Sequence, residues 1–179
     1  MSQKAWEAAE KSNLPKFYLN LKSYRKSLLS NSNPYTPAVN LIFALDEALQ
    51  MMREEGLDNI FLRHNKHKLA MSKGVKALNL KLFANEEYLS PSITAIKTEG
   101  IDAEEFRKTI KNNFDILLAG GQDHLKGKIF RVGHLGYVND RDIITVVSAI
   151  SNTLFDLGKI TSQQAGEALV VVSRYLEEN

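Results

Sequence analysis

The residues best suited to chemistry lie between positions 120 and 136, where five glycines occur together with a single arginine. That arginine, Arg131, lies inside the apolar run 129–132, where a charge is costly unless it has a partner. One partner would be an internal carboxylate such as Asp115 or Asp123. The other would be a substrate carboxylate, which a guanidinium group binds through two parallel hydrogen bonds. The residues alone leave both alternatives open.

The same glycines do not form a nucleotide phosphate loop. Five residues separate Gly121 from Gly127 where that motif requires four, and Ile129 stands where the motif needs a magnesium-binding Ser or Thr. The glycines instead indicate unusual backbone conformations, or a backbone that approaches another group closely.

Three histidines are further candidates. His64 and His67 are three apart on a predicted helix, a spacing that could hold a metal. Their basic neighbours, Arg63 among them, would repel a cation, so we expect two surface histidines on a solvated, basic helix face. His134 follows the arginine strand and is either a pocket residue or a core histidine with satisfied hydrogen bonds, and we expect the latter.

Composition limits the function classes. The chain has 179 residues, 44% of them hydrophobic, and its 23 basic and 21 acidic side chains give a net charge of +2. This balance does not favour nucleic acid or a membrane surface as a partner. The absence of cysteine removes thiolate metal sites and iron–sulfur clusters, and fits a reducing compartment. No apolar run has the length of a membrane span, so we expect a cytoplasmic protein.

Periodicity and capping residues predict the elements that position these side chains. The expected N-caps include Ser2, Asn139 and Thr161, and Gly158 is expected to stop a helix. Strands are expected at 80–83, 90–98, 114–119 and 128–132. Residues 17–21 are read as extended or as the first turn of a helix. Helices are expected at 2–11, 37–55, 58–78, 102–113, 139–157 and 161–176. This order predicts an α/β (α+β) domain with a small sheet covered by helices.

The helix after residue 36 has the clearest start signal, with Thr36 as N-cap and Pro37 in the first turn. It is apolar over more than half of its circumference, which is typical of a helix buried on two sides. We therefore expect it to pack against its own domain and against something else.

The segment Gly-Gly-Gln-x-x-Leu-Lys-Gly-Lys-Ile-Phe-Arg-Val-Gly-His-Leu-Gly at 120–136 resembles the C-terminal signature of the class V, pyridoxal-phosphate-dependent aminotransferases. The branch is that of the alanine–glyoxylate and serine–glyoxylate (serine–pyruvate) aminotransferases. Some cyanobacterial members of this branch are called soluble hydrogenase small subunit or tritium exchange subunit. The segments 35–39, 44–49, 54–57 and 90–95 are also similar to that branch.

The resemblance implies the C-terminal small domain of a fold-type I transferase, with a mostly antiparallel sheet. Residues 1–35 would be a remnant of the large domain and a linker, and 36–179 the small domain, with an interface helix at 37–55. Arg131 would bind the α-carboxylate of a small amino acid or 2-oxo acid. Thr36, with Tyr35 beside it, would reach the cofactor phosphate of the neighbouring subunit of a homodimer.

Two catalytic groups of the family have no counterpart in this sequence. The lysine that forms a Schiff base with pyridoxal phosphate, and the aspartate that holds the pyridine nitrogen, belong to the large domain. Lys4 follows Ser2-Gln3, as the family lysine does, but it leads directly into a helix and is expected to be an ordinary surface lysine. The chain alone is expected to have no catalytic residue, no covalent cofactor and no transaminase activity. The alternative is an accessory subunit of a soluble hydrogenase, or a stand-alone interaction module.

Overall fold

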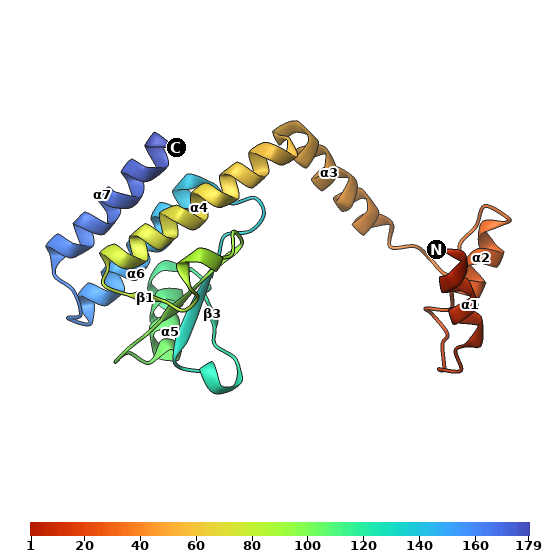
Figure 1. Ribbon diagram of the computed structural model, residues 1–179, viewed down its shortest axis with the longest axis horizontal. Coiled ribbons are helices and arrows are strands. Elements are labelled where there is room, and N and C mark those ends of the chain that lie inside the picture. Colours follow the sequence, from red (N-terminus) through yellow and green to blue (C-terminus); the bar gives the residue numbers. More distant parts are fainter. The chain divides into compact units, whose positions relative to one another are not determined.

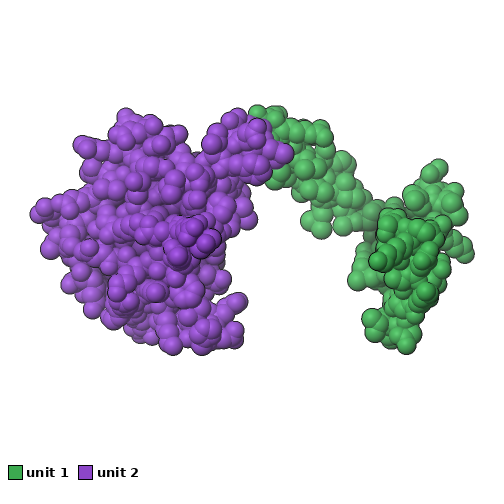
Figure 2. Space-filling model, viewed as in Figure 1, with its two compact units in different colours: residues 1–54 green, residues 55–179 purple.

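The computed structural model describes residues 1–179, which form seven α-helices and four strands. The chain divides into two compact units, residues 1–54 and 55–179 (Figure 2). Each unit is described by itself. The division of the chain at 35/36 into a large-domain remnant and a small domain stays a prediction. No helix is both long enough and apolar enough to cross a membrane.

The first unit contains α1 (Gln3–Lys11), α2 (Leu21–Leu28) and most of α3 (Val39–Glu55). Ser2 caps α1 as predicted. The sequence indicated at most a first helical turn near residue 21, whereas α2 continues for two turns behind the cap of Asn20. The predicted start of α3 is wrong by two residues. The carbonyl of Ala38 accepts the first helical hydrogen bonds, and the Thr36 side chain makes no capping bond.

No residue of the first unit is buried. Within this unit α3 has no buried residue, so the expectation that the helix after Pro37 packs against its own domain and against something else stays a prediction. An apolar helix without a covering layer exposes the side chains that would normally form a core. The exposed large apolar residues of α3 are Val39, Leu41, Ile42, Phe43, Leu45, Leu49, Met51 and Met52.

The second unit is a four-stranded, fully antiparallel sheet covered by helices (Figure 1). The strand order is β1-β2-β4-β3, with bounds β1 Lys81–Leu82, β2 Ile93–Lys97, β3 Ala119–Gly120 and β4 Ile129–Gly133. The helices are α4 (Leu57–Ala77), α5 (Ala103–Phe114), α6 (Asp140–Asp156) and α7 (Ser162–Glu178). Single 3₁₀ turns occupy Glu86–Tyr88 and Asp123–Leu125. This architecture confirms the predicted fold class.

The core lies on one side of the sheet. Successive side chains of a strand point to opposite faces, and in β4 Phe130 and Val132 are buried in the same cluster as Ile96 of β2. Helices α4 and α5 pack on the sheet, and α6 and α7 pack on each other and on α4 (Figure 1). Arg131 and Ala95 point to the opposite face, away from the core.

The capping signals locate most of these helices. Asn139 and Thr161 each form a reciprocal capping box, and Gly158 ends α6 with a φ of 65°. The predicted strand at 114–119 is wrong over most of its length. Phe114 still belongs to α5, Asp115 caps that helix in the left-handed region, and only residues 119–120 pair with β4.

Candidate functional site

Arg131 lies at the middle of β4 with a small residue on each neighbouring strand. It faces Ala95 of β2 on one side and Ala119 of β3 on the other. Its side chain is half-buried, and its Nε donates a hydrogen bond of 2.9 Å to the carbonyl of Gly120. The two alanines leave room around the guanidinium group on the open face of the sheet.

Arg131 forms no ion pair within the chain. The internal carboxylates considered as partners, Asp115 and Asp123, do not contact it, and the six ion pairs of the structure all involve other residues. One backbone carbonyl accepts a hydrogen bond from the guanidinium group, and the two terminal nitrogens make no hydrogen bond to the protein. Such a group can bind a carboxylate from outside the chain.

Both positions of the glycine pair before this strand are closely approached, Gly121 by backbone and Gly120 by the movable ends of side chains. A Cβ on Gly120 would meet the guanidinium of Arg107 at 2.5 Å, and one on Gly121 would collide with the backbone carbonyl of Leu125. Neither glycine has a positive φ, so the constraint at these positions is space and not backbone conformation. The pair lets the chain pass closely between α5 and β4 and brings the carbonyl of Gly120 to Arg131.

His134 is a core histidine, as predicted. Its side chain is completely buried, its Nδ1 donates to the carbonyl of Pro91 at 3.1 Å, and its Nε2 accepts from the hydroxyl of Thr94 at 2.9 Å. Burial lowers the pKa of His134 to about 4, and the nearby His67 and His64 act in the same direction. The ring is therefore neutral at physiological pH.

The prediction that His64 and His67 lie on the surface is wrong. Their exposed fractions are 7% and 0%. Nε2 of His67 lies 2.9 Å from the carboxylate of Asp140, which comes 73 residues later in the chain, and Lys66 binds the same carboxylate. Burial lowers the pKa of His67, although Asp140 opposes this effect. No group of three or more His, Asp or Glu side chains is arranged as a metal site.

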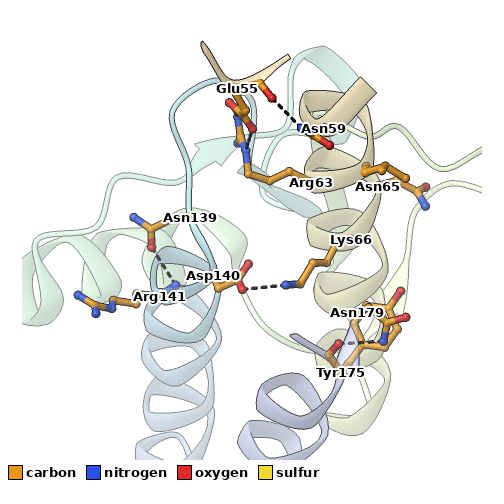
Figure 3. Close-up of a pocket in the computed structure, with 11 residues that line it drawn as sticks. Glu55, Asn59, Arg63, Asn65, Lys66, Asn139, Asp140, Arg141, Tyr175 and Asn179 are labelled. Carbon is orange, nitrogen blue, oxygen red and sulfur yellow. Dashed lines mark hydrogen bonds and ion pairs between the residues drawn. The ribbon is translucent and has the colours of Figure 1, made fainter. Parts of the chain in front are cut away.

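The sequence predicts only that Arg63 lies on a solvated basic helix face, whereas in the structure it also forms an ion pair. It lines an open cleft of about 820 Å³ along α4, in which Arg63 pairs with Glu55 and Lys66 with Asp140 (Figure 3). The partners of Arg63 lie up to 75 residues away in sequence, and no local signal reports them.

In the first unit, Tyr35 and Thr36 line an open cleft of about 880 Å³ with Asn31, Ser32 and Asn33 among its other residues. The Tyr35 hydroxyl already donates to the carbonyl of Phe17 at 3.1 Å. The Thr36 hydroxyl is exposed and makes no hydrogen bond. The hydroxyls and side-chain amides of this cleft, with no carboxylate among them, suit an anionic group such as a phosphate. Lys4 is exposed on α1.

Comparison with known proteins identifies the class to which this fold belongs. No family model matches the chain. It is 51% identical over 176 residues to the "Soluble hydrogenase, small subunit" of Synechococcus sp. (strain PCC 6716), covering 98% of this chain and 46% of the relative. It is 34% identical over 187 residues to the serine–glyoxylate aminotransferase of Methylorubrum extorquens, covering 100% of this chain and 46% of the relative.

Solved structures of aminotransferases are also similar to this chain. The ureidoglycine–glyoxylate aminotransferase of Bacillus subtilis superposes with a TM-score of 0.84 at 28% identity, over 96% of this chain and 45% of that one. The alanine–glyoxylate aminotransferase of Nostoc sp. has a TM-score of 0.75 at 27% identity, over 86% of this chain and 42% of that one. The chain spans about half the length of the relatives it matches. By sequence and fold the chain is similar to the C-terminal part of the class V aminotransferases.

Proposed function

We propose that this chain is the substrate-carboxylate-binding part of a pyridoxal-phosphate-dependent class V aminotransferase. The whole enzyme would move an amino group from alanine or serine to glyoxylate or pyruvate. The observation that carries the proposal is Arg131, a half-buried guanidinium on the open sheet face with no carboxylate partner in the chain. Amino acids and 2-oxo acids share the α-carboxylate that such a group recognises.

The residues present suggest the role of each part of the chain in this enzyme. Arg131 would bind and orient the substrate carboxylate. Thr36, with the backbone and side chain of Tyr35 beside it, would hold the cofactor phosphate of a neighbouring subunit in a homodimer. Pyridoxal phosphate, when bound, supplies the electron sink for reaction at the substrate α-carbon. We expect that Lys4, which lies exposed on α1, is an ordinary surface lysine and that the lysine anchor belongs to the part of the enzyme that this chain does not match.

The first unit supports the proposal that the chain functions with more protein around it. None of its residues is buried, and α3 exposes eight large apolar side chains. Such a surface needs a covering partner. The half of the relatives that this chain does not match would supply that partner in the proposed enzyme.

Complementation tests the proposal. The chain is co-expressed with the unmatched half of the Synechococcus relative, and transamination between alanine and glyoxylate is measured with pyridoxal phosphate present. We expect no activity from either half alone and activity from the pair. Loss of that activity on Arg131→Lys, with the pair still associated, would support the carboxylate role. Full activity of the variant pair would refute it.

A second experiment addresses Lys4. The chain alone is incubated with pyridoxal phosphate, reduced with borohydride and digested for mass spectrometry. We expect no site-specific label, with Lys4 no more reactive than Lys11 at the other end of α1. Stoichiometric labelling of Lys4 would show that the chain carries its own cofactor anchor.

The second candidate function is that of an accessory subunit of a soluble hydrogenase, or an interaction module without catalysis. It is favoured by the 51% identity to a protein of that name. Since the sequence contains no cysteine, thiolate-bound nickel–iron or iron–sulfur chemistry could not reside on this chain. Copurification of the chain with hydrogenase activity at a fixed stoichiometry would support this alternative.

A further inference from the structure

The strand on one side of Arg131 is short and has a single neighbour. β3 pairs only with β4, over two residues, and lies at the edge of the four-stranded sheet. The backbone groups on the free side of an edge strand have no strand partner. Arginine side chains bind two carbonyls here. The carbonyl of Leu118 accepts a hydrogen bond of 2.8 Å from Nε of Arg107, which lies on α5. The carbonyl of Gly120 accepts one of 2.9 Å from Nε of Arg131. Segment 118–120 thus connects the two arginines.

Arg107 is held in place by Glu104 on the same helix. Its Nη1 donates to both carboxylate oxygens at 2.9 Å, and the side chains of Arg107 and Glu104 are 22% and 39% exposed. This ion pair lies directly against the backbone of Gly120, because a Cβ at that position would lie 2.5 Å from Nη1 and 2.6 Å from a Glu104 oxygen. The pair therefore contacts the residue whose carbonyl binds Arg131.

Helix α5 is itself fixed to the core. Phe106 and Ile110 are buried, and the ring of Phe106 packs on that of Phe130 of β4 with 5.2 Å between the ring centroids. The helix also packs on β3 and β4 (Figure 1). An ion pair three residues apart on a helix stabilises that helix only slightly. The contacts of Arg107 with segment 118–120 go beyond such a pair, because they join the fixed helix to a strand edge.

We propose that Arg107, supported by Glu104, is a positioning residue for Arg131. It holds segment 118–120 against α5, and the carbonyl of Gly120 then fixes Nε of Arg131. The two terminal nitrogens of Arg131, which make no hydrogen bond to the protein, are thereby kept in one orientation. A guanidinium group that is already ordered binds a carboxylate with a smaller loss of conformational entropy than a mobile one.

The consequence for catalysis rests on the proposed function, since it assumes that Arg131 binds the substrate carboxylate. Without Arg107 the short β3 would open more often and release Nε of Arg131. In the complemented enzyme, Arg107→Gln should raise KM for alanine about 3- to 10-fold, the range for one lost hydrogen bond, with a smaller change in kcat. The positioning itself is a property of this chain and can be tested without activity.

Exchange of the Nε–H proton of Arg131 with water tests the proposal on the 179-residue chain. The arginine Nε–H signals are recorded by NMR at one mildly acidic pH, and the Arg131 signal is identified by its absence from Arg131→Lys. Its exchange rate is divided by that of backbone amides in the β2–β4 ladder, which report on opening of the whole unit. In Arg107→Gln we expect this ratio to rise about 3- to 10-fold while the ladder amides stay unchanged.

Matched variants assign the effect. Glu104→Gln keeps an oxygen that can accept from Nη1 of Arg107, so its ratio should rise, but less than that of Arg107→Gln. Lys108→Gln removes a positive charge from an exposed position of the same helix and should behave as wild type.

An unchanged ratio in Arg107→Gln would overturn the proposal, even if the ladder amides exchanged faster, because Arg107 would then only stabilise the unit. If Arg107→Gln does not fold, the comparison is made with Glu104→Gln, where an unchanged ratio has the same meaning. A raised ratio with an unchanged KM in the complemented enzyme would support the positioning and count against carboxylate binding by Arg131. The positioning and the proposed function can therefore fail separately.

Discussion

Replacing His134 by asparagine should make the stability of the second unit less dependent on pH. The ring is completely buried, and burial lowers its pKa from 6.5 to about 4. An asparagine amide can take over the hydrogen bond from Nδ1 to the carbonyl of Pro91, and it does not titrate. The variant should be less stable than wild type at pH 7, because it leaves Thr94 without its partner and part of the ring volume empty.

The size of the pH effect follows from linkage. In the folded chain His134 stays neutral down to about pH 4, while in the unfolded chain it takes up a proton below about pH 6.5. The unfolded state therefore binds more protons in this window, and the wild type loses stability as the pH falls through it. The loss is about 1.4 kcal/mol per pH unit, or about 3 kcal/mol between pH 6.5 and pH 4. Above pH 6.5 the contribution is fully present.

Urea unfolding of both proteins at pH 7 and pH 4.5, followed by far-UV circular dichroism, gives the required free energies. Tryptophan fluorescence is unsuitable, because the single tryptophan, Trp6, lies in the first unit. The stability advantage of the wild type over His134→Asn should shrink by about 2 to 3 kcal/mol between the two pH values. Parallel changes in the two proteins would refute the assignment, as would an NMR titration of His134 with a midpoint near 6.5.

Four further predictions concern other parts of the chain. Arg131→Lys should lower kcat/KM of the complemented enzyme by about 10- to 100-fold, because one ammonium replaces a bidentate fork; steady-state kinetics with alanine and glyoxylate measure this. Gly121→Ala should destabilise the second unit by about 1 to 3 kcal/mol, since its Cβ would collide with the carbonyl of Leu125. Gly166→Ala, with nothing within 4 Å, should stabilise it by about 0.5 to 1 kcal/mol in the same urea titration. Asn139→Ala should cost about 1 kcal/mol through loss of the capping box of α6, and an unchanged urea midpoint would contradict that value.

The parts of the fold that depend on local chemistry could be predicted from the sequence. Ser2, Asn139 and Thr161 cap the helices that they were expected to cap, and Gly158 ends α6. These signals act over three or four residues, so a short stretch of sequence contains them completely. The position of Arg131 on a strand could be predicted for the same reason.

The errors involve partners that are distant in sequence. His67 was expected on the surface because its neighbours are basic, but the carboxylate that binds it comes from α6. The strand predicted at 114–119 contains β-branched and aromatic residues, yet only Ala119 and Gly120 find a neighbouring strand. The apolar α3 was expected to be buried on two sides, and the first unit by itself buries none of its residues. Local patterns could not indicate which surfaces meet.

The hydrogen bond between Arg131 and Gly120 also determines the direction from which a carboxylate must approach. A guanidinium can bind a carboxylate through two hydrogen bonds at either of two edges. The side edge is formed by Nε and one terminal nitrogen, and the end edge is formed by the two terminal nitrogens. In this structure Nε is already committed to the carbonyl of Gly120 at 2.9 Å. Any carboxylate that binds Arg131 in two-point fashion while this bond persists must therefore meet it end-on. The carbonyl of Gly120 therefore leaves only one of the two edges of the Arg131 guanidinium free for a carboxylate.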